Sequence, residues 1–346
     1  MSVIDLCERG LIPDALARFG MRRLIAQRLA DESAGDAAAR HAQFVRALRA
    51  SPIAIHAQDA NAQHYEVPAE FFRLHLGPRL KYSCCLYGPQ ARTLAQAEDA
   101  MLELCAQRAD LADGQRILDL GCGWGSLSLW LAQRYPRAQV VGLSNSNGQR
   151  EFIEARARER GLGNLQVLTG NVAEFEFVDK SGSGATEFDR VLSVEMFEHM
   201  RNYAALLAKI ARWLVPGGQL FVHVFAHREL AYPFEVKDGG DWMSRHFFTG
   251  GLMPSARLLA EFQDDLRLAQ QWWIDGTHYQ RTANDWLAGM DARRGEILEV
   301  FRSGYGPGEA GVWLQRWRMF YMAVAELFGF RQGSEWGVAH YRFTRA

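Results

Sequence analysis

The sequence is poor in cysteine and has no excess of charge of either sign. Its five cysteines, Cys7, Cys84, Cys85, Cys105 and Cys122, are odd in number and show no C-x-x-C spacing, which argues against a disulfide framework and against a zinc site. The 39 basic and 40 acidic residues give a formal net charge of -1, so no overall field attracts nucleic acid. We therefore expect neither a bound metal nor a nucleic-acid partner.

Long apolar runs are absent as well. The longest uncharged apolar-rich stretch, 213–226, is interrupted by Pro216, Gly217 and Gly218, and it is shorter than the ~20 residues that a transmembrane helix needs. Residues 1–8 contain Asp5 and Glu8 and lack the basic start and apolar run of a signal peptide. We expect a cytoplasmic protein without a transmembrane segment.

A helical pattern extends from Leu11 to about Ala50. Apolar residues fall roughly on one stripe of this pattern, and acidic residues are interspersed with its arginines. This composition favours packing of the stripe on the protein itself, and contact with a membrane surface stays open as the alternative. The stripe consists of Leu16, Met21, Leu24, Ile25 and Leu29.

Strand and helix patterns alternate through the centre of the chain. A capping box at Thr93 and Gln96 opens a helix that runs to about Arg108. Apolar runs rich in Val, Leu and Ile then predict strands at 116–120, 139–143, 165–169, 188–194 and 219–225, separated by helices at 126–134, 149–160 and 203–214. This alternation predicts an α/β fold with a parallel sheet. Further strands are expected at 266–274 and 335–343, with helices from about Asp285 to Leu327 between them.

A glycine-rich turn, 119–125, lies directly between the first predicted strand and the following helix. Gly121 and Gly123 allow a sharp turn and a close approach of a ligand to the backbone. The spacing G-x-G-x-G differs from a dinucleotide fingerprint, and no Gly-Lys-Ser/Thr is present. Ser144 and Gln149 follow the next strand, at a position suited to ribose hydroxyls. By itself the turn is equally typical of a ligand loop and of a tight structural turn.

Two carboxylates and an imidazole follow the fourth predicted strand. If the segment is helical, Glu195, Glu198 and His199 share one face, where they can accept a proton and stabilise a cation. Pairing of Glu198 or His199 with Arg201 is the structural alternative. His223, at the end of the fifth strand, is expected to point into the same crevice, although a single strand-end histidine is more often a core residue.

These motifs together resemble a known enzyme family. Residues 119–125 resemble motif I of class I S-adenosylmethionine-dependent methyltransferases. With 82–85, 195–199, 223–225, 247–254 and 278–279 they are similar to the cyclopropane-fatty-acid synthase superfamily, and most similar to its coclaurine N-methyltransferase-like branch. The resemblance implies a Rossmann-like, mostly parallel seven-stranded sheet. It divides the chain into a helical segment, 1–62, and a methyltransferase domain, 63–346, with cap segments at about 227–265 and 281–330.

The resemblance also implies roles for individual residues. Those implied to bind S-adenosylmethionine are Tyr82, Ser83, Asp119, Gly121, Gly123, Ser144, Gln149, Asn171 and Val172. Those implied to be catalytic are Cys84, Glu195, Glu198, His199, His223 and Tyr279. In the synthases, the positions matching Cys84, Glu198, His223 and Tyr279 hold a bicarbonate that acts as base, and this sequence keeps all four side-chain types.

The expected function is methyl transfer from S-adenosylmethionine to the nitrogen of a small amine. The alternative is methylene transfer to an unsaturated lipid chain with bound bicarbonate, which would place the enzyme in lipid metabolism. A non-catalytic cofactor-binding or membrane-associated module is disfavoured, because such a module needs no convergent proton-handling groups. The identity of the acceptor and the formation of a homodimer stay open.

Overall fold

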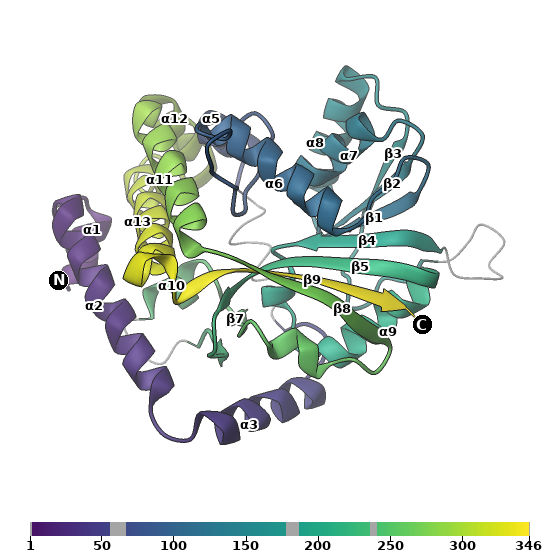
Figure 1. Cartoon of the computed structure of the whole chain (residues 1–346). Coiled ribbons are helices and arrows are strands. Elements are labelled where there is room, and N and C mark those ends of the chain that lie inside the picture. The colour runs from purple at the N-terminus through teal and green to yellow at the C-terminus, as the bar shows by residue number, and fades with distance from the viewer. Residues whose placement is uncertain (1, 56–66, 178–186, 236–240, 346) are drawn as a thin grey trace.

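A seven-stranded sheet forms the centre of the molecule (Figure 1). The computed structural model describes residues 2–55, 67–177, 187–235 and 241–345. In this part of the chain the strand order is β3-β2-β1-β4-β5-β9-β8, with β1 to β5 parallel and β9 antiparallel to both of its neighbours. The expected mostly parallel α/β sheet is confirmed. The strands are β1 (Arg116–Leu120), β2 (Gln139–Ser144), β3 (Leu165–Thr169), β4 (Phe188–Val194), β5 (Leu214–His227), β8 (Leu266–Ile274) and β9 (Trp336–Arg345).

Helices cover both faces of the sheet because its central strands are apolar on both sides. Leu118 and Val191 on one face, and Ile117 and Leu192 on the other, are all completely buried. The capping box of Thr93 and Gln96 is confirmed at the start of α6 (Leu94–Arg108). The helices α7 (Ser126–Arg134) and α8 (Asn147–Glu159) lie on the same face as α6, and α9 (Tyr203–Trp213) lies on the other (Figure 1). β5 begins earlier than expected, because Leu214 pairs with Phe188 before the Pro216 turn.

The segments outside the sheet pack over the carboxyl ends of the strands. After β8, the chain forms α11 (Gly276–Ala292), α12 (Arg294–Tyr305) and α13 (Ala310–Gly329), which begin earlier than the helices predicted from Asp285. α5 (Ala69–His75) packs against α11 and α12. The segment after β5 contains β6 (Tyr232–Pro233), α10 (Trp242–His246), β7 (Leu252–Met253) and the 3-10 turn η2 (Leu258–Glu261). A further 3-10 turn, η3 (Phe330–Gly333), precedes β9.

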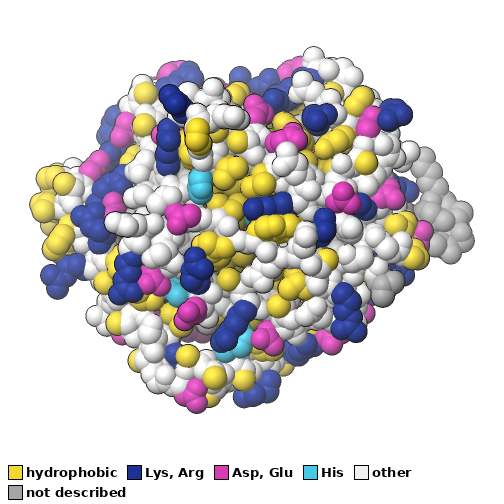
Figure 2. All heavy atoms as spheres, in the orientation of Figure 1, with side chains coloured by type: hydrophobic (Ala, Val, Ile, Leu, Met, Phe, Trp, Pro, Cys, Tyr) yellow, Lys and Arg dark blue, Asp and Glu magenta, His cyan; other side chains and the backbone are white. Residues whose placement is uncertain are grey.

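The N-terminal residues form three helices, and two of them, separated by a break, lie within the helical pattern predicted from Leu11 to about Ala50. These are α1 (Val3–Glu8), α2 (Asp14–Ser33) and α3 (Ala37–Ala50), and the break before α3 contains Gly35, which has a φ of +78°. On α2, Met21, Ile25 and Leu29 pack against the core as expected, whereas Leu16 and Leu24 are exposed. Figure 2 shows hydrophobic side chains at the left edge of the molecule, where Figure 1 places α1 and α2.

The N-terminal helices are tied to the cap by ion pairs. Arg18 and Arg22 on α2 lie 2.8 and 2.7 Å from the carboxylate oxygens of Glu326 on α13. α3 packs against α9 on the other side of the sheet. None of the helices in the described ranges combines the length and the apolar composition of a transmembrane helix.

Candidate active site

The glycine loop after β1 has a conformation that requires glycine. Gly121, Gly123 and Gly125 have φ values of +83°, +51° and +80°. A Cβ on Gly121 would lie 2.7 Å from Met196 Cγ, and one on Gly125 would lie 2.6 Å from Ile153 Cγ1. A Cβ on Gly123 would meet no described atom within 4 Å, because this glycine faces two adjoining cavities. The loop therefore presents open backbone to a ligand at Gly123.

Asp119, at the end of β1, connects this loop to the helix that follows it. Its buried carboxylate accepts a hydrogen bond of 2.6 Å from the Ser128 hydroxyl, which connects the end of β1 to α7. Burial raises the pKa of Asp119 to about 6, and the Ser128 hydrogen bonds act in the opposite direction. Asp119 also lines the larger cavity.

The smaller of the two cavities has a volume of about 70 Å³. At its edge the Ser144 hydroxyl donates a hydrogen bond of 2.7 Å to Gln149 Oε1, which fixes the orientation of the amide. Gln149 Nε2 is buried and has no hydrogen-bond partner within the described ranges. Asn171 Oδ1 accepts a hydrogen bond from Ala173 N and shapes the neighbouring turn. The predicted residues Ser144, Gln149, Asn171 and Val172 all line this cavity.

The larger cavity has a volume of about 160 Å³ and shares Gly121, Gly123 and His199 with the smaller one. One wall is polar and contains Tyr82, Ser83, Asp119, Glu195, Glu198, His199 and Tyr279. The apolar part of the lining comes from both cap segments, with Phe234, Met243, Phe248, Met253, Phe320 and Val324 among its residues. Of the predicted site residues, only Cys84 and His223 lie outside both linings.

Two buried charges that the sequence analysis missed hold the segment carrying Tyr82 and Ser83. The Glu98 carboxylate on α6 accepts hydrogen bonds from the backbone N–H groups of Arg79 (2.9 Å) and Lys81 (3.0 Å). Lys81, which is 2% exposed, donates to the Cys84 carbonyl (2.8 Å) and to Ser83 Oγ. The sequence signal was weak, because a single Glu in a helical pattern is usually on the solvent face.

Glu195 lies just after β4 in a left-handed backbone conformation, with a φ of +48°. Its N–H donates to the His223 carbonyl at 2.8 Å. Its Oε1 accepts from Cys84 N (3.0 Å) and lies 3.2 Å from His223 Nε2, and its Oε2 accepts from the Tyr279 hydroxyl at 2.6 Å. Burial raises the pKa of Glu195, whereas Lys81, Cys84 N–H and Tyr279 lower it.

Glu198 and His199 lie on the 3-10 turn η1 (Phe197–His199) and Glu195 is left-handed, so the helical arrangement that would put the three on one face is not the one observed. The left-handed residue at Glu195 starts a tight turn there, and this turn brings all three side chains to the larger cavity. Glu198 Oε2 is buried and has no hydrogen-bond partner among the described residues. Burial, and then the charge of Glu195, raise the pKa of Glu198 well above its usual value.

Two other expectations change in detail. The thiol of Cys84 donates to the Cys85 carbonyl, so Cys84 reaches the acidic cluster through its backbone N–H. Arg201, the alternative partner of Glu198, donates to the Gly251 carbonyl instead. Trp124 packs edge-on against the Phe152 ring, and its ring centroid lies 5.4 Å from that of Phe72; Trp124 also lines the larger cavity.

The cavities fit S-adenosylmethionine. The open backbone at Gly123 and the unpartnered Gln149 donor suit the nucleoside, and the adjoining polar wall suits a cationic methyl donor. The fold and this site define a class I S-adenosylmethionine-dependent methyltransferase.

Comparison with known proteins gives the family. The family profile of mycolic acid cyclopropane synthetase matches residues 54–333, and the chain belongs to this family. The chain is 37% identical to an (S)-coclaurine N-methyltransferase of Thalictrum flavum subsp. glaucum, over 100% of this chain and 96% of the relative. A crystal structure of coclaurine N-methyltransferase bound to N-methylheliamine and SAH has a TM-score of 0.94 at 35% identity, covering 99% of both chains. The cyclopropane-fatty-acyl-phospholipid synthase of Escherichia coli K12 is 29% identical over 69% of the chain and 58% of its own length.

Proposed function

We propose that this methyltransferase transfers the methyl group of S-adenosylmethionine to the nitrogen of a small aromatic amine. The observation that carries the proposal is one cavity that is lined both by two carboxylic residues, Glu195 and Glu198, and by aromatic and aliphatic side chains. Carboxylates attract an ammonium group, and an apolar wall accommodates a flat ring. The relatives supply the first amines to test, coclaurine and the parent amine of N-methylheliamine.

The two carboxyl groups take different roles in this proposal. Three hydrogen-bonding groups and the nearby charge of Lys81 favour the ionised form of Glu195 against the effect of burial, and we assign to Glu195 the anchoring of the substrate cation. Glu198 Oε2 has no hydrogen-bond partner among the described residues, and the raised pKa of Glu198 makes it the stronger proton acceptor once it is ionised. The positive charge of a bound ammonium lowers the pKa of Glu198 and favours that ionised form.

When bound, S-adenosylmethionine supplies an electrophilic methyl carbon on a sulfonium. Glu198 removes the proton from the substrate ammonium, and the freed nitrogen lone pair then forms the new N–C bond. The C–S bond breaks, and its electron pair stays on sulfur. The chain contributes mainly by orientation, since holding two reactants near attack distance supplies ~7–11 kcal/mol of barrier reduction. We assign this orientation to Tyr82, Ser83, His199 and the aromatic wall.

We also propose that the cap segments, 227–265 and 281–330, select the substrate. Phe234, Met243, Phe248 and Met253 come from the first, and Phe320 and Val324 come from the second. Large side chains from two separate segments limit the shape of the bound ring system. Substitution at Phe248 or Phe320 is therefore expected to change substrate preference more than cofactor affinity.

The position of Glu195 bears on the lipid alternative. Its carboxylate is bonded by Cys84 N–H and the Tyr279 hydroxyl and lies next to His223, three of the residues that the resemblance assigned to bicarbonate. In our proposal this internal carboxylate replaces the external anion. Methylation of an amine should then proceed at the same rate in bicarbonate-free buffer and after bicarbonate is added back, whereas bicarbonate dependence would support the synthase alternative.

Isotope labelling tests the proposal directly. The enzyme is offered cofactor with a fully deuterated methyl group, together with either aromatic amines or vesicles of unsaturated phospholipid, and the products are examined by mass spectrometry. An amine product that retains three deuterons establishes N-methylation. A lipid product that retains two deuterons means a methylene bridge and refutes the proposal.

A further inference from the structure

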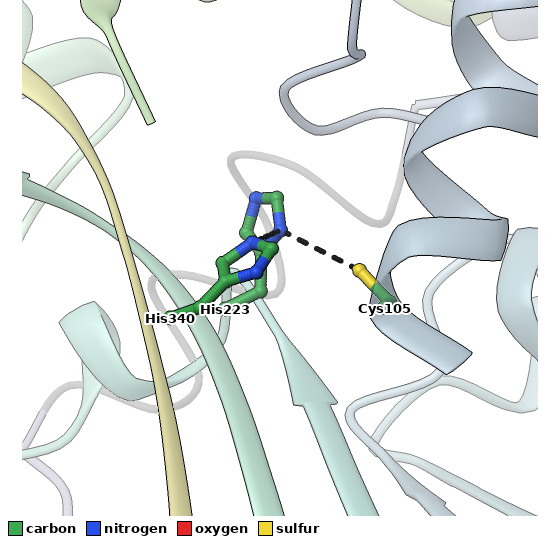
Figure 3. A group of neighbouring side chains, drawn as sticks. All are labelled: Cys105, His223 and His340. Carbon is green, nitrogen blue, oxygen red and sulfur yellow. Dashed lines mark hydrogen bonds between the residues drawn. The ribbon is translucent and has the colours of Figure 1, made fainter. Parts of the chain in front are cut away.

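Behind Glu195, a row of side chains crosses the sheet beneath α6. His223 on β5 is the direct cross-strand partner of His340 on β9, and His340 is in turn opposite Trp272 on β8. Both imidazoles are fully buried, and their rings lie 4.7 Å apart. Figure 3 shows the two rings with Cys105, which points toward them from α6. The row ends at Arg108, whose guanidinium lies 4.9 Å from the Trp272 ring.

The hydrogen bonds in this row have only one consistent direction. Arg108 Nη1 lies 2.8 Å from His340 Nδ1, and a guanidinium can only donate, so His340 Nδ1 is the acceptor. A neutral His340 then carries its proton on Nε2 and donates to His223 Nδ1 at 2.8 Å. His223 therefore carries its proton on Nε2, which faces Glu195 Oε1 at 3.2 Å. Arg108 thus determines the tautomer of both histidines and makes His223 a donor to Glu195.

The same geometry excludes two other roles for this cluster. Cys105, His223 and His340 have ligand atoms close enough to suggest a metal site. A metal on His340 Nε2 would require Nδ1 to carry the proton, but Nδ1 faces the Arg108 donor. Outward transfer of a proton from Glu195 would likewise require both histidines to reverse their tautomers, and this would place an N–H of His340 against Arg108.

We propose that Arg108 and His340 are positioning residues that act through His223 to hold the Glu195 carboxylate in its productive orientation. The proposal rests on the proposed function, in which Glu195 anchors the substrate cation. This row of hydrogen-bonded side chains is not explained by packing alone. Within the described ranges Arg108 has no carboxylate partner, and His340 beside it neither lines the cavity nor contacts solvent. Glu195 has a strained backbone with a φ of +48°, and such a conformation needs surrounding groups to hold it in place, which the hydrogen-bonded row supplies.

A spectroscopic test of the hydrogen-bonded row needs no substrate. The full-length protein is labelled with 15N-histidine, and the ring nitrogens are observed by NMR between pH 6 and 8, with His340→Gln used to assign the His340 signals among the ten histidines. We expect His223 and His340 to be neutral, with the proton on Nε2, throughout this range. An imidazolium, an Nδ1 proton on either ring, or stoichiometric zinc in the purified protein would overturn the proposal.

The turnover rate then tests whether the hydrogen-bonded row positions Glu195. Arg108→Met keeps an aliphatic stem over Trp272 but removes the donor, and we expect kcat to fall by about 10- to 100-fold, since a displacement of about 1 Å costs up to ~10²-fold. Affinity for SAH should stay within about twofold, because Arg108 lines neither cavity. Arg108→Lys, which restores a charged donor, should recover most of the rate. His340→Gln should do better than His340→Leu, because an amide both accepts from Arg108 and donates to His223.

The pH profile separates positioning from a merely structural role. The titratable and charged groups around the two histidines are Arg108 and Cys105 from α6, Lys81 and Glu195. Glu195 itself is also faced by Cys84, Glu198 and Tyr279. Without Arg108 the histidines can change tautomer or take up a proton, so we expect a new ionisation in the acid limb of kcat for Arg108→Met. Arg108→Lys should lack it.

Arg190→Met is the matched control. Arg190 also supports the end of α6, where it donates to the carbonyls of Ala109 (3.0 Å) and Asp110 (3.2 Å), and among the described residues it has no hydrogen bond to His340. An equal loss of kcat in the two methionine variants, or an unchanged kcat and pH profile in Arg108→Met, would refute the positioning role. If no amine is methylated by the wild type, the proposed function fails, while the NMR result still decides whether the hydrogen bonds from Arg108 through His340 and His223 to Glu195 are present.

Discussion

Replacing Gly123 with alanine tests whether the cofactor lies on the glycine loop. Gly123 has a φ of +51°, and the added Cβ would meet no described atom within 4 Å. The fold should therefore lose only the cost of a left-handed alanine, about 1–2 kcal/mol. The same Cβ would project toward two cavities, where it blocks close approach of a ligand. We expect the affinity for SAH to fall at least about tenfold, or ~1.4 kcal/mol of binding free energy.

Gly161→Ala is the matched control for backbone strain. Gly161 has a φ of +66°, its added Cβ also meets no atom within 4 Å, and it follows α8 away from both cavities. The two variants should lose similar unfolding free energy in chemical denaturation, and only Gly123→Ala should bind SAH more weakly in titration calorimetry. Equal SAH affinities would refute the assignment of the loop.

Three further predictions concern buried ionisable groups. Glu198→Gln should lower kcat by about 10²–10⁴-fold without changing SAH affinity, because Glu198 is the proposed base; a rate close to that of the wild type in a steady-state methylation assay would remove it from the mechanism. Tyr279→Phe should lower kcat by about tenfold or more, since it removes the 2.6 Å hydrogen bond to Glu195, and unchanged kinetics would contradict this. Burial raises the pKa of Glu98 to about 7, so the folded state holds the proton of Glu98 more tightly than the unfolded state does. As the pH rises from 5 to 8, the free energy of unfolding of the wild type should therefore decrease relative to that of Glu98→Gln, by about 3 kcal/mol at most. A pH-independent difference in unfolding free energy between these two proteins would show that this titration does not occur.

Local patterns were sufficient to predict much of the sheet. β1, β3, β4, β8 and α7 have the bounds that their apolar periodicity and flanking turn residues indicated. Each of these signals lies within a few residues of the element that it specifies, because apolar side chains, caps and glycines act on the backbone beside them. For the same reason, the glycine loop could be placed between β1 and α7 before its φ values were known.

The acidic turn shows where local reasoning fails. On a helix, spacings of three and four residues would put Glu195, Glu198 and His199 on one face, but Glu195 is left-handed and is followed by a 3-10 turn. A non-glycine residue adopts that conformation only when its surroundings hold it there. The groups that contact Glu195 come from Cys84, His223 and Tyr279, and they are distant in sequence.

The sequence by itself determined the order of strands and helices, the glycine turn and the residue types at the site, because these depend on short-range periodicity and on recurring motifs. Only the tertiary structure decided which side chains are charged, paired or oriented. Lys81 and Glu98 become buried partners of a loop, and His340 meets His223 across 117 residues of sequence. Such contacts depend on how strands pair and helices cover them, and no pattern of neighbouring residues encodes them separately.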